Sequence, residues 1–202
     1  MRFIVVYEGS IILLDTNVLT KLIESLDCKL SSCEYLITGE LFCNCSLDIS
    51  IIMPKEALKE LKRCREEVEF CLLTYEKLVA IGGKRIKHRV SLVSYKELSK
   101  RLRVKLKIVY SLKDYEETLR DVGDVVDKSL INVSLIKANN CRRVKSGVVV
   151  LLTMDRKLRE KLHDLASKVQ LINHILTPNI SLNTLDKCLD AECFIRCVLQ
   201  SV

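Results

Sequence analysis

Four carboxylates in this sequence each follow or border an apolar segment. Asp15 and Asp155 each end a short apolar run that a helical pattern follows. Glu60 and Asp127 lie near the starts of two other helical patterns, beside the apolar stripe. Carboxylates that converge repel one another, and their pKa values rise unless a divalent cation neutralises them. Because every ligand in such a site is an oxygen, the site would favour Mg²⁺ or Mn²⁺.

The segments that would position these acids alternate between strand and helix. Short apolar runs predict four strands, at residues 11–14, 47–53, 147–153 and 169–176. Apolar spacing of three to four predicts helices at residues 18–26, 32–45, 55–82, 113–122 and 124–140, after 155, and after 181. This alternation is typical of a three-layer α/β/α sandwich on a mostly parallel sheet of about five strands. Right-handed crossovers place the carboxyl ends of parallel strands at one edge, so Asp15 and Asp155 should converge.

Each acid also has an ordinary structural explanation. Asp15 could be a helix cap, although Thr16 or Asn17 is the expected cap of the first helix. Glu60 could be a solvated side chain, and Glu56, one turn earlier, could take its place. Asp124 and Asp127 could be first-turn acids favoured by the helix dipole. We prefer Asp127 as the third acid, because it starts the apolar stripe of its helix.

Residues 84–107 carry a strong positive charge. They contain ten Lys or Arg and one acid, a local charge of +9 against +7 for the whole chain. Residues 101–108 alternate basic and apolar, which predicts a strand with one basic face. Such a face suits a phosphate backbone, although edge-strand protection is an alternative explanation. The residues predicted to contact nucleic acid are Lys84, Arg85, Lys87, Arg89, Arg101, Arg103, Lys105 and Lys107.

Length and composition predict a compact protein. The chain has 202 residues, 49% hydrophobic and 29% charged, with only 6 Gly and 2 Pro. No apolar run approaches the roughly 20 residues that span a bilayer, so we expect a cytoplasmic protein. We expect one domain at 1–176, beginning with an extra strand or arm at 1–7, and a helical extension at 177–202 that packs on it or forms a dimer contact. The apolar face expected for this extension is Leu182, Leu185, Leu189, Phe194 and Val198.

The ten cysteines do not form a recognisable zinc motif. Cys193 and Cys197 lie one helical turn apart, a spacing that a metal or a disulfide could use. We expect most of the thiols to be small buried apolar residues. A disulfide in a cytosolic protein would instead point to a hyperthermophile.

Four short motifs resemble those of the PIN-domain nucleases and occur in that family's order. They are Leu13–Leu19 (LLDTNVL), Pro54–Leu61 (PKEALKEL), Asp127–Ile131 (DKSLI) and Leu152–Asp155 (LTMD). The resemblance covers about residues 11–176, and the chain has extra material around 28–45, in the basic segment and after 178. It implies the three-layer fold, cleavage of single-stranded RNA and dimerisation. It also implies a Mg²⁺ or Mn²⁺ site on Asp15, Glu60, Asp127 and Asp155, with Thr16, Asn17 and Thr153 as hydrogen-bonding supports.

These observations predict a metal-dependent endoribonuclease whose basic segment binds RNA. An antitoxin or an RNA-processing protein is the partner that the resemblance would imply. The first alternative is a catalytically silent PIN-like domain that binds RNA or serves in assembly. The second, a nucleotide- or phosphate-binding domain, is disfavoured because neither GxGxxG nor GxxxxGK[ST] occurs.

Overall fold

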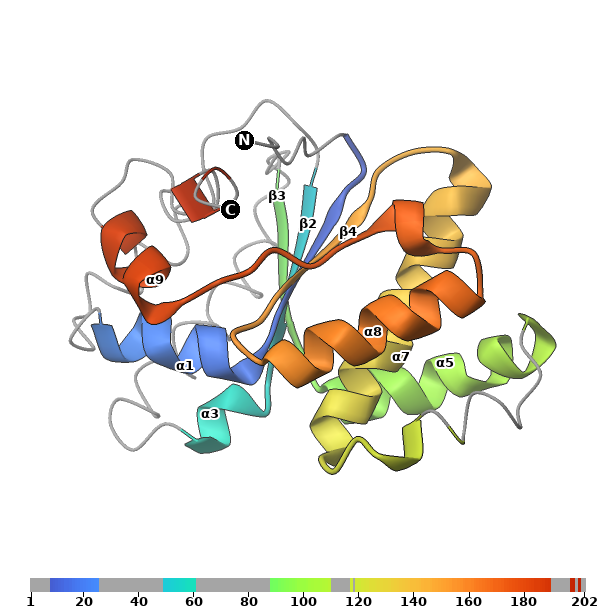
Figure 1. The fold of residues 1–202 in the computed structure, drawn as a ribbon, viewed down its shortest axis with the longest axis horizontal. Helices are drawn as coiled ribbons and strands as arrows, with labels where there is room; N and C mark the ends of the chain where they lie inside the picture. Colours follow the sequence, from blue (N-terminus) through green and yellow to red (C-terminus); the bar gives the residue numbers. More distant parts are fainter. Residues whose placement is uncertain are drawn as a thin grey trace, which may run out of the picture.

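A five-stranded parallel sheet forms the centre of the protein (Figure 1). The computed structural model describes residues 8–25, 49–60, 88–109, 117, 119–189, 197–198 and 200, and for 25, 88–90, 103–109 and 189 it describes the backbone alone. The strands are β1 (Ile11–Leu14), β2 (Ile49–Pro54), β3 (His88–Val93), β4 (Val149–Leu152) and β5 (Ile175–Leu176). Their order in the sheet is β3-β2-β1-β4-β5, and every neighbouring pair is parallel.

Helices cover both faces of this sheet (Figure 1). They are α1 (Thr16–Ser25), α3 (Ala57–Glu60), α5 (Tyr95–Val109), α7 (Val125–Val144), α8 (Arg156–Lys168) and α9 (Leu182–Leu189), with a short 3₁₀ turn, η1, at Ile172–His174. Residues of α1, α3 and α9 pack against one face, and residues of α5, α7 and α8 pack against the other. The predicted α/β architecture with a parallel sheet between helical layers is therefore confirmed.

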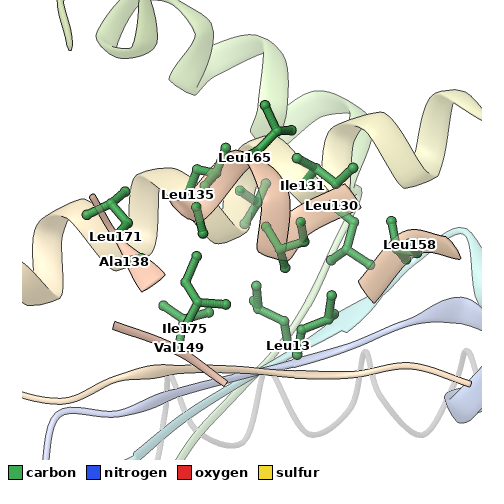
Figure 2. Close-up of a cluster of buried hydrophobic side chains, with 14 of the residues drawn as sticks. Leu13, Leu130, Ile131, Leu135, Ala138, Val149, Leu158, Leu165, Leu171 and Ile175 are labelled. Atoms are coloured by element: carbon green, nitrogen blue, oxygen red, sulfur yellow. The ribbon is translucent and has the colours of Figure 1, made fainter. Parts of the chain in front are cut away.

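Side chains of the central strands alternate between the two hydrophobic clusters. Ile12 and Leu14 of β1 point into the cluster on the α1 side. Leu13, with Val149 of β4, belongs to the cluster beneath α7 and α8 (Figure 2). All of these side chains are fully buried. Burial on both faces explains why the two central strands read as continuous apolar runs.

The strand predicted at residues 101–108 is wrong, because these residues continue helix α5. The third strand lies earlier, at β3, where it pairs with β2. Tyr95, Leu98 and Leu102, at helical spacing, pack into the α7-side cluster. Burial of that stripe outweighs the period-two alternation, which spans only eight residues.

Several element boundaries differ from their predicted positions. Helix α1 begins at Thr16, so neither Thr16 nor Asn17 is its cap; the carbonyl of Asp15 instead accepts a hydrogen bond from the Leu19 N–H (3.1 Å). The last strand is only β5, because Gln170 has a left-handed φ of 56° and the 3₁₀ turn η1 follows it. Each change follows from backbone hydrogen bonding that the apolar pattern does not report.

The chain after β5 joins the core on the α1 side. Ile180, Leu185 and Val198 are buried in that cluster, and Cys188 forms a disulfide with Cys197. The expectation of buried thiols was therefore wrong for this pair, whereas Cys141 is a buried free thiol. Leu182 is 51% exposed, so its predicted place on the apolar face is also wrong.

Several predictions concern residues outside the described part of the chain. These are the arm at 1–7, the helix at 32–45, most of the helix at 55–82, half of the helix at 113–122, Cys193 and Phe194. Within the part of the chain that the structure describes, no helix is both long and apolar enough to cross a bilayer.

Candidate functional site

The order of the strands makes β1 and β4 the topological switch point of the sheet. From β1 the chain winds outward through β2 and β3 on one side, and β4 and β5 lie on the other side. Crossovers therefore leave β1 and β4 in opposite directions, and ligands of open α/β sheets bind at such a point, outside the carboxyl ends of the strands. Asp15 directly follows β1, and Thr153 directly follows β4.

Asp15 is held by hydrogen bonds on both carboxylate oxygens. Its Oδ1 accepts the Thr16 N–H at 2.6 Å. Its Oδ2 accepts the Asn17 amide at 2.8 Å and the Thr153 hydroxyl at 2.5 Å. The side chain is only 3% exposed, and burial raises its pKa, partly offset by these hydrogen bonds and reinforced by Asp155. Asn17 and Thr153 thus both donate hydrogen bonds to the Asp15 carboxylate.

Thr16 supports Asp15 through its backbone alone. The Thr16 hydroxyl is buried and has no hydrogen-bond partner among the described residues. The expected contribution of its side chain to the hydrogen bonding is therefore absent within that set, and its N–H supplies the contact instead.

Asp155 connects the end of β4 with the start of α8. Its Oδ1 accepts the backbone N–H groups of Lys157 (2.7 Å) and Leu158 (3.1 Å), so it is the N-cap of α8. Its own N–H donates to the Thr153 hydroxyl at 3.0 Å. The Thr153 hydroxyl thus hydrogen-bonds both the backbone N–H of Asp155 and the carboxylate of Asp15.

Asp124 and Asp127, left as alternatives by the sequence, have different surroundings. Asp124 is exposed and caps α7 by accepting the Val126 N–H at 2.7 Å. Asp127 is half-buried and forms no hydrogen bond or ion pair with the residues that the structure describes. Asp127 is therefore the more available ligand, while Asp124 already has a structural partner.

Glu56 and Glu60 likewise differ in their surroundings. The Glu56 carboxylate accepts hydrogen bonds from the Ser94 hydroxyl (2.7 Å) and from the backbone N–H groups of Tyr95 (3.2 Å) and Lys96 (3.3 Å). It therefore holds the start of α5 beside β2. Glu60 is exposed, and Asp124 and Asp15 both raise its pKa, after burial as the largest cause. Glu60, not Glu56, is thus the glutamate near the other acids.

The carboxylates affect one another electrostatically. The pKa of Asp127 is raised to about 6, by burial first and then by the charges of Asp15, Asp124, Asp155 and Glu60. Among the described residues, the ion pairs involve other acids than these five. A divalent cation would relieve this repulsion, and an all-oxygen donor set suits Mg²⁺ or Mn²⁺. No three described His, Cys, Asp or Glu side chains are arranged as a formed metal site.

Two residues that were not predicted from the sequence, Tyr95 and Arg159, hydrogen-bond to backbone carbonyl groups near the carboxyl ends of the strands. Tyr95 is fully buried, and its hydroxyl donates toward the carbonyl oxygens of Leu14 (2.5 Å) and Ile52 (3.0 Å). Arg159 donates to the carbonyl oxygen of Thr153 at 3.0 Å. The Tyr95 contacts join residues 81 and 43 positions apart, so the apolar pattern carries no signal for them, whereas Arg159 lies only six positions from Thr153.

The basic segment lies partly on α5. Lys96 and Lys100 are exposed, and positions 96, 100, 103 and 107 share one face of this helix. That face lies away from the apolar stripe that packs against the core. Arg101 is exposed on another face, with Lys105 near it, and Arg89 belongs to β3. Lys84, Arg85 and Lys87 lie outside the described residues.

A cavity of about 790 Å³ adjoins the acids between the start of α7 and the first turns of α8. Its lining includes Asp124, Asp127 and Asp155, and also Lys157 and Lys161. Asp15 and Glu60 are outside this lining. The cavity is therefore open to the α7 and α8 members of the acid cluster only.

No protein-family model matches this chain, and no curated protein or solved structure matches it either.

Proposed function

We propose that this protein is a metal-dependent endoribonuclease of PIN type, which hydrolyses phosphodiester bonds of single-stranded RNA. The proposal rests on the placement of four acids. Asp15 and Asp155 follow neighbouring parallel strands, and the charges of Asp15, Asp155 and Glu60 all raise the pKa of Asp127. None of the four has an ion-pair partner in the described part of the chain. Groups whose pKa values are shifted by burial and by specific charged neighbours cluster at functional sites, and open α/β sheets bind their ligands outside the carboxyl ends of the strands.

Asp15, Asp127, Asp155 and Glu60 would hold a Mg²⁺ or Mn²⁺ ion. The chemistry supplied by such an ion is activation of a water nucleophile and neutralisation of charge on the reacting phosphate. Asn17 and Thr153 fix the Asp15 carboxylate in one orientation by hydrogen bonds. Asp155 is fixed by capping α8, with one of its oxygens left for a ligand. Rigid ligands of this kind lower the cost of organising the site.

The positive charge of the chain supports a polyanionic substrate. The local charge of +9 at residues 84–107 exceeds the charge of the whole chain, and Lys96, Lys100 and Arg101 are exposed. Helix α5 begins beside the carboxyl ends of β1 and β2, where Tyr95 contacts both strands. A strand of RNA could therefore contact α5 while one of its phosphates reaches the acids.

Mn²⁺-dependent cleavage of a fluorescent single-stranded RNA would test this proposal. Asp15→Asn and Asp155→Asn should each abolish cleavage, because the substitution removes a ligand charge and keeps the size of the side chain. Asp186→Asn, an exposed aspartate on α9, is the matched control and should cleave normally. Thermal melting of each variant would verify that it folds.

Cleavage by the wild type that survives in both site variants would contradict the proposed site. Absence of cleavage, with no rise in melting temperature on adding Mn²⁺, would refute a catalytic role. RNA binding that persists in that case would instead favour a silent RNA-binding or assembly module.

A further inference from the structure

The cavity beside the acid cluster has two lysines on the α8 side. Lys157 and Lys161 lie one helical turn apart on α8, and both line the cavity together with Asp127 and Asp155. With a volume of about 790 Å³, the cavity is in the size range, about 300–1,000 Å³, of pockets that hold small ligands. A single nucleotide is a ligand of this size class.

The acids that line the cavity divide into those with an ion-pair partner and those without one among the described residues. Three of the lining acids are already paired, Asp121 with Lys161 (3.3 Å), Glu160 with Arg156 (2.7 Å) and Asp164 with Lys168 (2.9 Å). The lining acids without an ion pair among the described residues are those of the candidate metal centre, Asp124, Asp127 and Asp155.

Lys157 is a lining base that, like these acids, has no ion-pair partner among the described residues. The pair between Lys161 and Asp121 is solvent-exposed at 35% and 75%, and such pairs contribute little to stability. Lys157 is therefore available to a phosphate group that enters the cavity, and Lys161 could bind one by exchanging its exposed contact with Asp121.

We infer that this cavity is the subsite for the nucleotide next to the scissile phosphate, and that Lys157 and Lys161 bind its phosphate. The inference rests on the proposed function, which places the scissile phosphate at Asp127 and Asp155. The neighbouring phosphate must then lie a short distance away, and the acids alone would repel it. Lys157 and Lys161 supply positive charge in the lining of the same cavity.

The test compares the steady-state kinetics of Mn²⁺-dependent RNA cleavage in three single variants. Lys157→Ala and Lys161→Ala should each raise KM roughly three- to tenfold and leave kcat within about twofold, because they remove binding shared by substrate and transition state. The dependence of log(kcat/KM) on log[salt] should become shallower by about 0.7 for each lysine removed. Lys187→Ala, exposed on α9 and outside the cavity lining, is the control and should change none of these values.

The outcomes separate the subsite from the nuclease. Cleavage with an unchanged KM in both cavity variants, or with the same change in Lys187→Ala, would overturn the subsite and leave the nuclease intact. If the wild type does not cleave, RNA binding by fluorescence anisotropy decides. Selective weakening by the two cavity variants would support the subsite without the nuclease, and no such weakening would refute both.

A mononucleotide could present the same phosphate chemistry, so a competition experiment with UMP completes the design. Inhibition by UMP that Lys157→Ala abolishes, while KM for RNA is unchanged, would assign the cavity to a free nucleotide and overturn the inference. Parallel losses of RNA and UMP binding are expected, because both would use the same contacts.

Discussion

At the scale of single residues, Asp127 is a half-buried acid whose ionisation is disfavoured by burial and by neighbouring charges. Burial and four surrounding carboxylates raise its pKa to about 6 from an ordinary value of 3.8. The unfolded chain therefore releases this proton at lower pH than the folded chain does. The free energy of unfolding should then fall as the pH rises from about 4 to about 6, and stay low above that range.

Replacing Asp127 with Asn should stabilise the metal-free protein at neutral pH. The shift discounted for solvent exposure corresponds to about 1 kcal/mol, since Asp127 is only half-buried. Urea unfolding in EDTA at pH 4.5 and pH 7.5 measures this effect. The variant should gain stability at pH 7.5 alone, and Asp186→Asn should resemble the wild type. Equal pH dependence in Asp127→Asn and the wild type would show that the acids do not interact as described.

At the scale of elements, two glutamates at the end of β2 have separate duties. Glu56 holds the first turn of α5, and Glu60 lies at the end of α3 among the site acids. The sequence could not decide between them, because Glu56 and Glu60 lie one turn apart at the start of the same predicted helix. The position of α5, which is far away in sequence, decides the role of Glu56.

Glu56→Ala should therefore affect mainly stability, and Glu60→Ala mainly RNA cleavage. Glu56→Ala should lower the free energy of unfolding by about 1–2 kcal/mol, because the N–H groups at the start of α5 lose their acceptor. Glu60→Ala should change stability by less than about 0.5 kcal/mol but reduce cleavage roughly tenfold or more. Chemical unfolding and RNA cleavage on both variants measure the two effects. Equal loss of stability in the two variants would contradict this division.

Helix α5 also shows how a local pattern can mislead. Residues 101–108 alternate as a strand does, but Tyr95, Leu98 and Leu102 form a helical stripe that starts before that window. The helix buries this stripe against α7, whereas a strand would have needed a neighbouring strand to pair with. The basic positions of α5 consequently form a face at 96, 100, 103 and 107 that differs from the alternate residues predicted from the sequence.

At the scale of the whole molecule, the last helical segments are part of the core. Leu185 and Val198 are buried beside Val18 and Leu22 of α1, and the Cys188–Cys197 disulfide closes a loop between them. This link restricts the unfolded chain more than the folded one. Residues after 176 thus add to the hydrophobic layer on the α1 face of the sheet.

Reduction of this disulfide should lower the stability of the wild type. A loop with a sequence separation of 9 residues corresponds to about 2.5 kcal/mol in the chain-entropy description. Melting curves with and without reductant measure the effect, after alkylation and mass spectrometry confirm that both thiols have been released. The variant with Cys188→Ala and Cys197→Ala isolates this bond from the other cysteines and should lose the part of the response due to it. A wild type whose melting is unaffected by complete reduction would contradict the prediction.

The order of residues in the sequence determined the central strands and the places of Asp15 and Asp155 at their ends, but not β3. Apolar runs that end in Asp15 and in Thr153–Asp155 predict buried parallel strands, and right-handed crossovers bring their carboxyl ends together. Asp15 and Asp155 were therefore predictable as neighbours, since each depends on its own strand and on a rule of topology that applies to both.

Only the tertiary structure decided which nearby residues serve the acids and which serve the framework. Glu56 is occupied because α5 begins beside it, and Tyr95 is buried because its hydroxyl reaches two strand ends at once. The pairing of Cys188 with Cys197 depends in the same way on how the chain folds back after α9. These contacts depend on distances between segments that are remote in sequence, and local patterns of hydrophobicity and charge do not encode such distances.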